Sequence, residues 1–350
     1  MESPVLNSPM RITMLGTMGV GKTTFLTAMY QEMGYEGRSG FYLKTDTTTD
    51  KFLTGKWNEM IETFDWPQPT PDYREFDFDL VFGTKFIKKF TFVDYRGGSL
   101  RGIETDDKQA EKLMEDIDRS DCLLILADSY FIANSHKYIA TARNELQIIQ
   151  SFLDKYITSH PQKYLSIGVI LTKIDLVSPE NYDDFRHRCF TVFKNLTTLT
   201  LNHRPRVEFS YIPISVTGYG NCAVDVTLHG NMPVVTCKLT DFPEPLFVSW
   251  PVLYSVKKSF EFRQREILAL KRAINSDRTA LKNRDWIDRI VAVLRGEKLT
   301  WFKDLELLEE LDKLEVENRA IEDRVAHLVT EVEVLGDGWR EQLHMPNGRR

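Results

Sequence analysis

The feature that most constrains the fold of this chain is a glycine-rich loop between an apolar strand and a helix. Arg11–Leu15 is a short, mostly apolar run, and apolar residues recur at helical spacing through Phe25–Tyr30. The loop fits G-x-x-x-x-G-K-[ST], a pattern that carries meaning only in this strand, loop and helix context. Its residues are Gly16, Thr17, Met18, Gly19, Val20, Gly21, Lys22, Thr23 and Thr24. The context test is met.

The chemistry of this loop is anion capture. Glycines let backbone N–H groups turn inward around a phosphate, and the helix start adds unpaired donors and a positive dipole end. Lys22 supplies a charge near the terminal phosphates, and Thr23 offers a hydroxyl to Mg²⁺. The loop therefore predicts a nucleoside triphosphate with magnesium as the ligand.

Composition limits the remaining classes. The 350 residues suggest about two domains, and 42% hydrophobic with 27% charged residues is typical of a globular protein. The net charge of −6 gives no overall reason to expect nucleic acid. No apolar run approaches the roughly 20 residues of a membrane span, and residues 1–11 lack a hydrophobic signal core, so a cytoplasmic location is predicted.

Four cysteines are present and form no C-x-x-C pair, which favours free thiols. Cys222, His229 and Cys237 share one segment, but their loose spacing disfavours a zinc site.

A second motif follows the apolar strand Phe90–Val93. Asp94 ends that strand and Gly97 comes three residues later, with Arg96 between them. A carboxylate there can hold the magnesium shell, and the glycine lets a backbone N–H approach the terminal phosphate. D-x-x-G alone is common, but at a strand end after a phosphate loop it is specific.

A third motif, Thr172-Lys173-Ile174-Asp175, follows the apolar strand Tyr164–Leu171. The Asp175 carboxylate can accept two hydrogen bonds from guanine N1 and N2, which adenine cannot supply, while the Lys173 stem covers the base. This favours GTP over ATP.

Together these motifs resemble the Ras-like, translation-factor-related class of P-loop GTPases over roughly residues 10–260. Asp94–Gly97 resembles the third motif of that class and Thr172–Asp175 the fourth. Ser215 and Val216 resemble the looser fifth motif, whose backbone contacts the guanine oxygen. The resemblance implies a G domain, an α/β fold with a mostly parallel six-stranded sheet flanked by helices, that binds GTP or GDP with Mg²⁺.

The expected organisation has four parts. The antiparallel strands 76–82 and 86–93 precede Asp94, and residues 50–64 show the apolar spacing of a helix. Residues 41–43 are expected to form a short strand, and residues 219–240 a hairpin. The parts are a tail at 1–10, the G domain at 11–260 with inserts near 41–65 and 219–240, a helical hairpin or coiled coil at 261–336, and a tail at 337–350.

The second motif of the class, a threonine that joins magnesium and senses the γ-phosphate, has two rival positions. Thr47–Thr49 lie at about the usual distance after the phosphate loop, whereas Thr70 lies just before the strand that pairs with the Asp94 strand. We choose Thr70 because that topology matches the class. The Trp66–Thr70 segment also resembles GTPases of bacterial conflict or defence gene clusters.

Two departures from the class predict slow hydrolysis. Gly98 stands where Ras-like enzymes place a water-orienting glutamine, and Met18 would crowd an arginine finger from a partner. Arg96 or Arg101 is a candidate source of transition-state charge in cis. A non-hydrolysing scaffold that holds GTP is the first alternative, and an ATP-dependent P-loop enzyme, disfavoured by Asp175, is the second.

The C-terminal third changes to helix-forming residues with opposite charges. Residues 256–298 hold 12 Lys or Arg against 6 Asp or Glu, and residues 299–335 hold 4 against 11 and carry heptads from Leu307 to Leu335. Like charges would meet at the flanks of a parallel homodimer, so we favour an antiparallel hairpin with dimerisation second. The adjacent acidic segment disfavours nucleic acid, and residues 256–335 are the expected surface for a protein effector.

The choice of Thr70 generates the first prediction. Thr70→Ala should weaken the magnesium-dependent discrimination of GTP from GDP, because the hydroxyl would join the metal only in the triphosphate state. Nucleotide titrations with and without Mg²⁺ measure this. Unchanged discrimination would transfer the role to Thr47–Thr49.

Overall fold

The computed structural model describes most of the first 276 residues and a few positions beyond them. The described residues are 9–16, 19–35, 40–67, 73–94, 107–134, 147, 149–151, 153–160, 164–203, 206–229 and 232–276, with single helical positions between 312 and 323.

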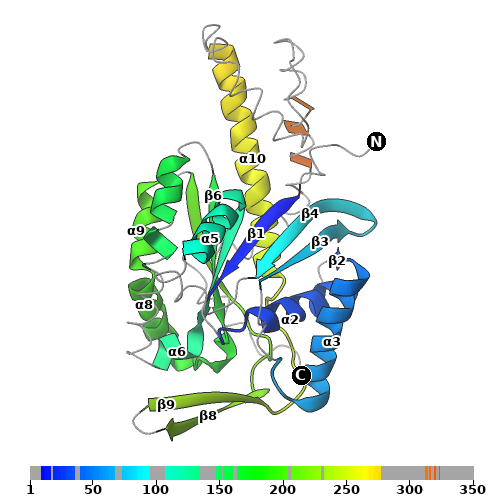
Figure 1. The fold of residues 1–350 in the computed structure, drawn as a ribbon, viewed down its shortest axis with the longest axis vertical. Helices are drawn as coiled ribbons and strands as arrows, with labels where there is room; N and C mark the ends of the chain where they lie inside the picture. The colour runs from blue at the N-terminus through cyan, green and yellow to red at the C-terminus, as the bar shows by residue number, and fades with distance from the viewer. Residues whose placement is uncertain are drawn as a thin grey trace.

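Helices and strands alternate along the chain, with two short 3₁₀ turns (Figure 1). In chain order the elements are β1 (Met10–Leu15), α2 (Lys22–Tyr35), β2 (Phe41–Lys44), α3 (Thr47–Thr63), β3 (Arg74–Phe82), β4 (Lys85–Asp94), α5 (Asp107–Arg119), β5 (Cys122–Asp128), α6 (Ser129–Asn134), β6 (Leu165–Thr172), η1 (Ile174–Leu176), η2 (Pro179–Asn181), α8 (Tyr182–Val192), α9 (Lys194–Asn202), β7 (Val207–Pro213), β8 (Cys222–His229), β9 (Met232–Leu239) and α10 (Trp250–Ser276).

The central sheet has seven strands in the order β2-β3-β4-β1-β5-β6-β7. Strands β4, β1, β5, β6 and β7 run parallel, and β3 and β2 continue the sheet antiparallel. The chain is therefore a mixed α/β protein with a mostly parallel sheet flanked by helices. Five parallel strands bring their carboxyl ends to one edge, which is where ligands bind in sheets of this kind.

The expected number of six strands is wrong. Residues 41–65, assigned to an insert, contribute β2 to the sheet, where Phe41 pairs with Phe82 and Lys44 with Asp79. Without β2 the long strand β3 would expose a row of unpaired backbone groups at the sheet edge. The expected antiparallel pair β3–β4, the helix α3 and the hairpin β8–β9 are confirmed.

Aromatic side chains form the core beneath β3 and β4. Phe78, Phe90 and Phe92 alternate with outward residues and contact one another, with ring centroids 5.5–6.1 Å apart. Phe25 of α2 meets Phe92 edge-on at 6.5 Å. This packing fixes the start of α2, and with it the glycine-rich loop, against the sheet.

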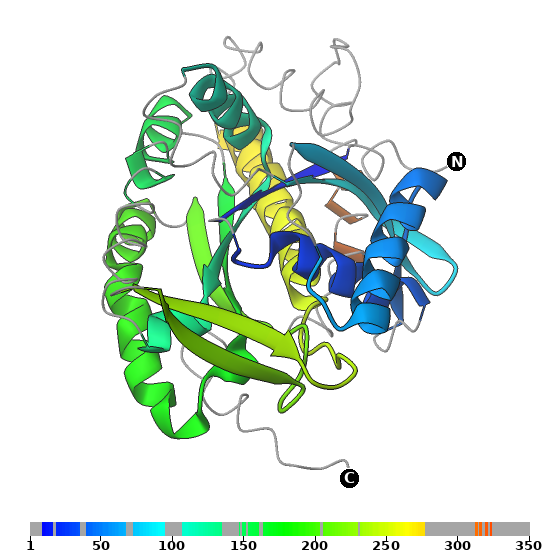
Figure 2. The same ribbon diagram turned by 60° about the horizontal axis from the view of Figure 1, so that its bottom comes forward.

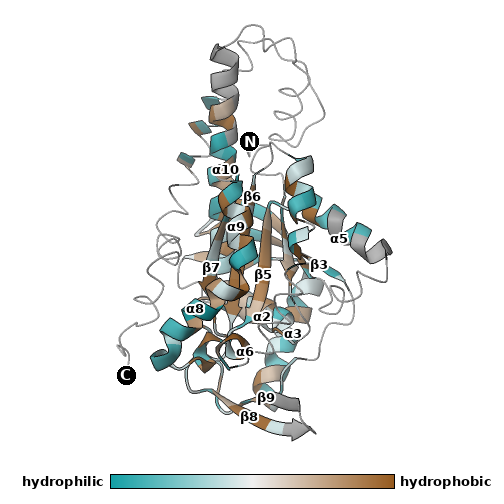
Figure 3. Ribbon diagram, turned by 90° about the vertical axis from the view of Figure 1, so that its left-hand side faces the viewer, coloured by the Kyte–Doolittle hydropathy of each residue, from teal (hydrophilic) through white to brown (hydrophobic). Residues whose placement is uncertain are grey.

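The long helix α10 covers the sheet on the side away from α5 (Figure 3). Gly168 of β6 leaves room for it, since an added Cβ would lie 2.8 Å from Leu124 and 3.6 Å from the ring of Tyr254. The Tyr254 hydroxyl donates to the Ile167 carbonyl at 3.3 Å. The C-terminal part of α10 continues past the sheet in Figure 1. None of the described helices is both long and apolar enough to cross a membrane.

The expected coiled coil falls mostly outside the described residues. Single helical positions between 312 and 323 are described, and there Gln264 of α10 donates to the Glu315 carboxylate at 3.4 Å. The helical hairpin and its dimeric alternative stay predictions.

The ion pairs of Glu208 fasten α10 to β7 and generate a pH-dependent prediction. Arg265 lies 2.6 Å and Lys258 3.1 Å from its carboxylate. Burial alone would raise the pKa of Glu208, but the Arg265 hydrogen bond and the Lys258 charge outweigh it and hold the pKa below its ordinary value. A carboxyl group with a lowered pKa stabilises the folded state above its unfolded pKa and loses that effect as pH falls.

Glu208→Gln should therefore lower the free energy of unfolding at pH 7 by about 1 kcal/mol. The difference from the wild type should shrink as pH falls below the ordinary value of 4.5. Denaturant unfolding between pH 7 and 4 measures this. Glu59→Gln, which breaks only the exposed pair with Lys56, is the control and should change little.

Candidate functional site

The glycine-rich loop joins β1 to α2 at the carboxyl edge of the sheet. Gly19 and Gly21 have φ of 79° and 96°, in the left-handed region that side chains disfavour, and a Cβ on either would meet nothing within 4 Å. Their requirement is therefore conformational. The Phe25 N–H donates to the Gly21 carbonyl at 2.8 Å, so the helix starts directly at the loop. Thr17 and Met18 lie outside the described residues.

Lys22 is folded back over this loop. Its ammonium donates to the Gly16 carbonyl at 2.9 Å, and only 8% of the residue is exposed. The loop thus combines a buried positive charge with the N–H groups of a helix N-terminus. Val20 lies in the loop, and Thr23 and Thr24 lie in the first turn of α2, as expected for a phosphate site.

Asp94 lies beside the loop on the neighbouring strand, because β4 pairs with β1 and places it opposite Met14. Burial raises the pKa of Asp94 to about 6, although the charges of Lys22 and Arg74 oppose the shift. Its Oδ1 atom is buried and has no hydrogen-bond partner among the described residues. A buried carboxylate oxygen left open beside an anion loop fits a hydrated magnesium ion.

Thr172 and Lys173 connect the Thr172–Asp175 motif to the glycine-rich loop. The Thr172 hydroxyl lies 3.0 Å from the Val20 carbonyl and 3.1 Å from the Ala127 carbonyl. Lys173 has φ of 57° and extends its ammonium to Asp128 at 2.6 Å and to the Gly19 carbonyl at 3.5 Å. These contacts hold the two motifs at one edge of the sheet.

Asp175 faces the loop that follows β7. The Thr217 hydroxyl donates to its Oδ2 atom at 2.8 Å, while Oδ1 is buried without a partner among the described residues. Burial raises the pKa of Asp175, and hydrogen bonds from Ser215 and Thr217 counter it. Ser215 is fully buried and accepts from the Gly218 N–H at 2.8 Å. Val216 lies between these residues, so the candidate fifth motif sits against Asp175.

The open oxygens of Asp94 and Asp175 mark the two ends of one site. Asp94 lies next to Lys22, where phosphates and metal would bind, and Asp175 lies where Lys173 reaches back to Gly19. The acceptor at Asp175 suits the N–H groups of guanine, and the residues at both ends fit a magnesium-bound guanine nucleotide.

The residues expected to sense the γ-phosphate or to take part in hydrolysis are not among those that the structure describes. Thr70, Arg96, Gly97, Gly98 and Arg101 lie outside the described residues.

The rival position is described. Thr47–Thr49 form the first turn of α3, where Asp46 caps the helix, accepting from the Thr48 and Thr49 N–H groups and, at 2.7 Å, from the Thr49 hydroxyl. The Thr48 and Thr49 N–H groups and the Thr49 hydroxyl are thus engaged in a helix cap.

Sequence analysis missed Asp128. This residue ends β5, is 3% exposed, pairs with Lys173 and accepts from the Phe131 N–H at 3.1 Å at the start of α6. Burial would lower the pKa of Lys173, but the Asp128 carboxylate outweighs it and raises that pKa. An aspartate ending a buried strand was the available signal, as it was for Asp94.

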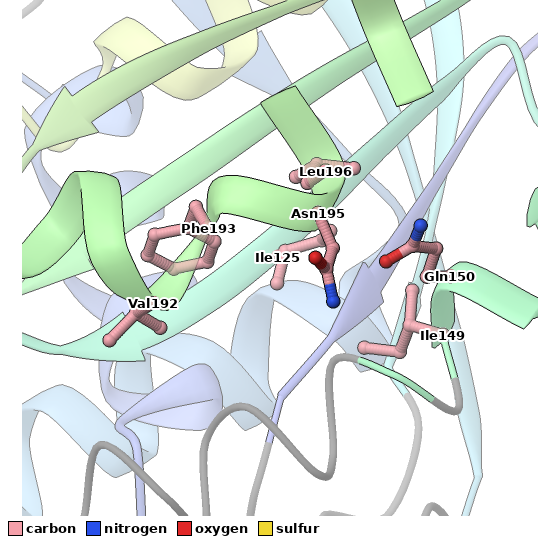
Figure 4. A pocket seen from close by; sticks show the side chains of 7 residues that line it. All are labelled: Ile125, Ile149, Gln150, Val192, Phe193, Asn195 and Leu196. Atoms are coloured by element: carbon pink, nitrogen blue, oxygen red, sulfur yellow. The ribbon is translucent and has the colours of Figure 1, made fainter. Parts of the chain in front are cut away.

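A small pocket lies elsewhere, between β5 and helices α8 and α9 (Figure 4). Its lining is Ile125, Ile149, Gln150, Val192, Phe193, Asn195 and Leu196. This lining holds no charged side chain, cysteine or histidine, so we treat the pocket as a packing gap. Among the described residues no group of three or more His, Cys, Asp or Glu side chains could hold a metal ion.

Comparisons with known proteins add similar architectures at low identity. No protein-family model and no curated protein sequence matches the chain. The signal recognition particle receptor SRb-GTP/SRX complex from Chaetomium thermophilum aligns with 12% identity and a TM-score of 0.39, over 61% of this chain and 94% of that chain. The GDP complex of the small COPII coat GTPase SAR1 from Encephalitozoon cuniculi aligns with 13% identity and a TM-score of 0.29, over 60% of this chain and 71% of that chain.

The GTP-bound Ski7 GTPase-like domain of S. cerevisiae gives 16% identity, a TM-score of 0.30, and coverage of 59% of this chain and 42% of that chain. These values are too low to assign a function. We therefore base the function on the geometry of the site itself.

The Lys173–Asp128 pair generates a prediction. Asp128→Asn should weaken GTP and GDP binding about 10-fold, because a neutral amide holds the ammonium less firmly than a carboxylate does. The amide oxygen can still cap α6, so the fold should be retained. Titration of a fluorescent guanine nucleotide measures the affinity, with Asp184→Asn, which breaks an exposed pair with Arg188, as the matched control. Equal affinity in both variants would remove Asp128 from the site.

Proposed function

We propose that the chain is a GTP-binding switch that binds Mg²⁺-GTP at the glycine-rich loop and hydrolyses it slowly to GDP. The observation that carries the proposal is a pair of buried carboxylate oxygens, one of Asp94 and one of Asp175, that have no hydrogen-bond partner among the described residues and lie at the carboxyl edge of the sheet that also carries Lys22. A buried acceptor without a partner costs free energy, so its retention at both ends favours a ligand that satisfies it.

Each motif has a distinct role in this proposal. Loop N–H groups and Lys22 bind the phosphates, Thr23 and Asp94 hold the metal shell, and Asp175 selects guanine. Lys173 covers the base, and Asp128 positions the Lys173 side chain. Bound magnesium neutralises charge on the phosphates.

The finer parts of the proposal rest on the sequence. Thr70 and Gly97 would sense the γ-phosphate, and their release after hydrolysis would pass to a protein effector through residues 256–335. Gly98, in place of the usual glutamine, supports slow hydrolysis. The same residue supports the second candidate, a scaffold that holds GTP without hydrolysing it.

Affinity and phosphate-release measurements separate these functions. The switch should bind GTP and GDP in preference to ATP, require Mg²⁺ for full GTP affinity, and release phosphate in single turnover. A scaffold would show the same selectivity with no phosphate release, and preference for ATP would refute the guanine assignment. If the Arg96→Ala variant releases phosphate at the wild-type rate, that arginine takes no part in catalysis.

The open oxygen of Asp175 gives a sharper prediction. Asp175→Asn should weaken GTP binding about 100-fold, because a charged acceptor facing two guanine donors becomes an amide whose N–H₂ opposes the guanine amino group. Xanthosine triphosphate carries a carbonyl at that position, so its affinity should rise in the variant. Competition titrations measure both nucleotides, with the exposed Asp183→Asn as control. A variant that keeps GTP selectivity would refute the role of Asp175.

A further inference from the structure

Two thiols, those of Cys222 and Cys237, lie in the β8–β9 hairpin, which follows the loop that holds Ser215 and Thr217 beside Asp175. The hairpin lies beyond the carboxyl edge of the sheet (Figure 2). Cys222 pairs across the hairpin with Leu239, and Val224 pairs with Cys237. Because side chains alternate along a strand, Cys222 and Cys237 lie diagonally on the same hairpin face. Both are partly exposed, and their side chains interact.

The charges around the pair make the two thiols unequal. The hydrogen bond with the Cys222 side chain and the Lys173 ammonium together lower the pKa of Cys237 to about 7, although burial and the carboxylates of Asp128 and Asp175 oppose the shift. The same interaction raises the pKa of Cys222. Cys237 is thus the thiolate and Cys222 the proton-bearing neighbour, which is the division of roles in a reactive dithiol.

The other two cysteines provide a contrast within the same chain. Cys122 and Cys189 are at most 1% exposed. Burial raises the pKa of Cys122 to about 11 and raises that of Cys189 as well. Such thiols are inert, so reactivity toward oxidants should be confined to the hairpin pair.

The cysteine pair is also linked to the segment that precedes Thr70 and lies near Lys173. The Trp66 indole donates to the Cys237 carbonyl at 2.5 Å, and the rings of Phe64 and Phe242 lie 5.7 Å apart. On the other side, Lys173 lies within electrostatic range of both thiols. A change in the β9 backbone at Cys237 would therefore act directly on Trp66 and would occur within electrostatic range of Lys173.

We propose that Cys222 and Cys237 form a reversible disulfide under peroxide, and that this bond weakens guanine-nucleotide binding. The second clause rests on the proposed function and the first does not. The Cα atoms of diagonal partners are typically about 7–8 Å apart, whereas disulfides usually join Cα atoms about 4.4–6.8 Å apart. Closing the bond draws β9 toward β8 and displaces the acceptor of Trp66.

The chemistry balances with hydrogen peroxide as the oxidant. The Cys237 thiolate attacks one peroxide oxygen, the O–O bond breaks, and the departing hydroxide takes a proton from solvent to give water and a sulfenic acid. The Cys222 sulfur then attacks the Cys237 sulfur, the S–O bond breaks, and the leaving hydroxide takes the Cys222 proton. Both sulfurs are oxidised and the peroxide is reduced to two waters. A thiol reductant reverses the bond, and a strained disulfide is easily reduced.

The first experiment maps thiols by mass spectrometry in the full chain after peroxide treatment. A linked Cys222–Cys237 peptide that disappears with dithiothreitol, with Cys122 and Cys189 unmodified, is the expected result. In Cys222→Ser a sulfenic-acid probe should label Cys237, whereas Cys222 in Cys237→Ser should stay unlabelled. No linked peptide, or equal labelling of the buried cysteines, would overturn the dithiol assignment.

The second experiment measures GDP affinity of reduced, oxidised and re-reduced protein. Oxidation should weaken binding at least 3-fold, re-reduction should restore it, and Cys222→Ser and Cys237→Ser should bind as the reduced wild type and not respond. A disulfide with unchanged affinity would overturn the regulatory clause. Reduced protein that binds no guanine nucleotide would refute the proposed function, while the mapping would still decide the disulfide.

Discussion

The candidate site depends on a small set of bonds that fix the Thr172–Asp175 motif to the glycine-rich loop. Lys173 links Asp128 to the Gly19 carbonyl, and the Thr172 hydroxyl lies between the Val20 and Ala127 carbonyls. The bonds to Ala127 and Asp128 join the carboxyl ends of the neighbouring strands β5 and β6, and the bonds to Gly19 and Val20 reach the loop that follows β1. Because most of these groups are buried, the contacts are strong and the loops are held before any ligand arrives, which reduces the ordering cost of binding.

The motifs could be recognised in the sequence because each of them is local. The Gly16–Thr24 loop, Asp94 and Thr172–Asp175 each end a strand, and parallel strands bring those ends together. Asp128 escaped notice because its role depends on a lysine far along the chain. The short strand at residues 41–43 was expected but was assigned to an insert, since the four residues of β2 show no pattern that separates a sheet edge from an insert.

The positive charge of α10 illustrates what a charge count leaves out. The sequence assigns an excess of Lys and Arg to residues 256–298, yet Lys257 is 6% exposed and Lys258 pairs with Glu208 and Glu261. Arg265 pairs with Glu208 as well. In the described part of α10 these cations are engaged within the protein, which weakens the case for a nucleic-acid surface there. Charges held this way stabilise the docking of a helix on its sheet.

The β8–β9 hairpin is joined by hydrogen bonds to the loop after β7 and to the segment after α3. Asn221 donates to the Thr217 and Phe242 carbonyls at 3.0 Å each, and the Thr240 N–H donates to the Asn221 carbonyl at 3.0 Å. These bonds fasten the base of the hairpin to the loop that holds Asp175. Trp66 binds the same hairpin from the opposite side. The sequence offered no chemistry for residues 219–240, but they contact both the loop that contains Thr217 and the segment that precedes Thr70.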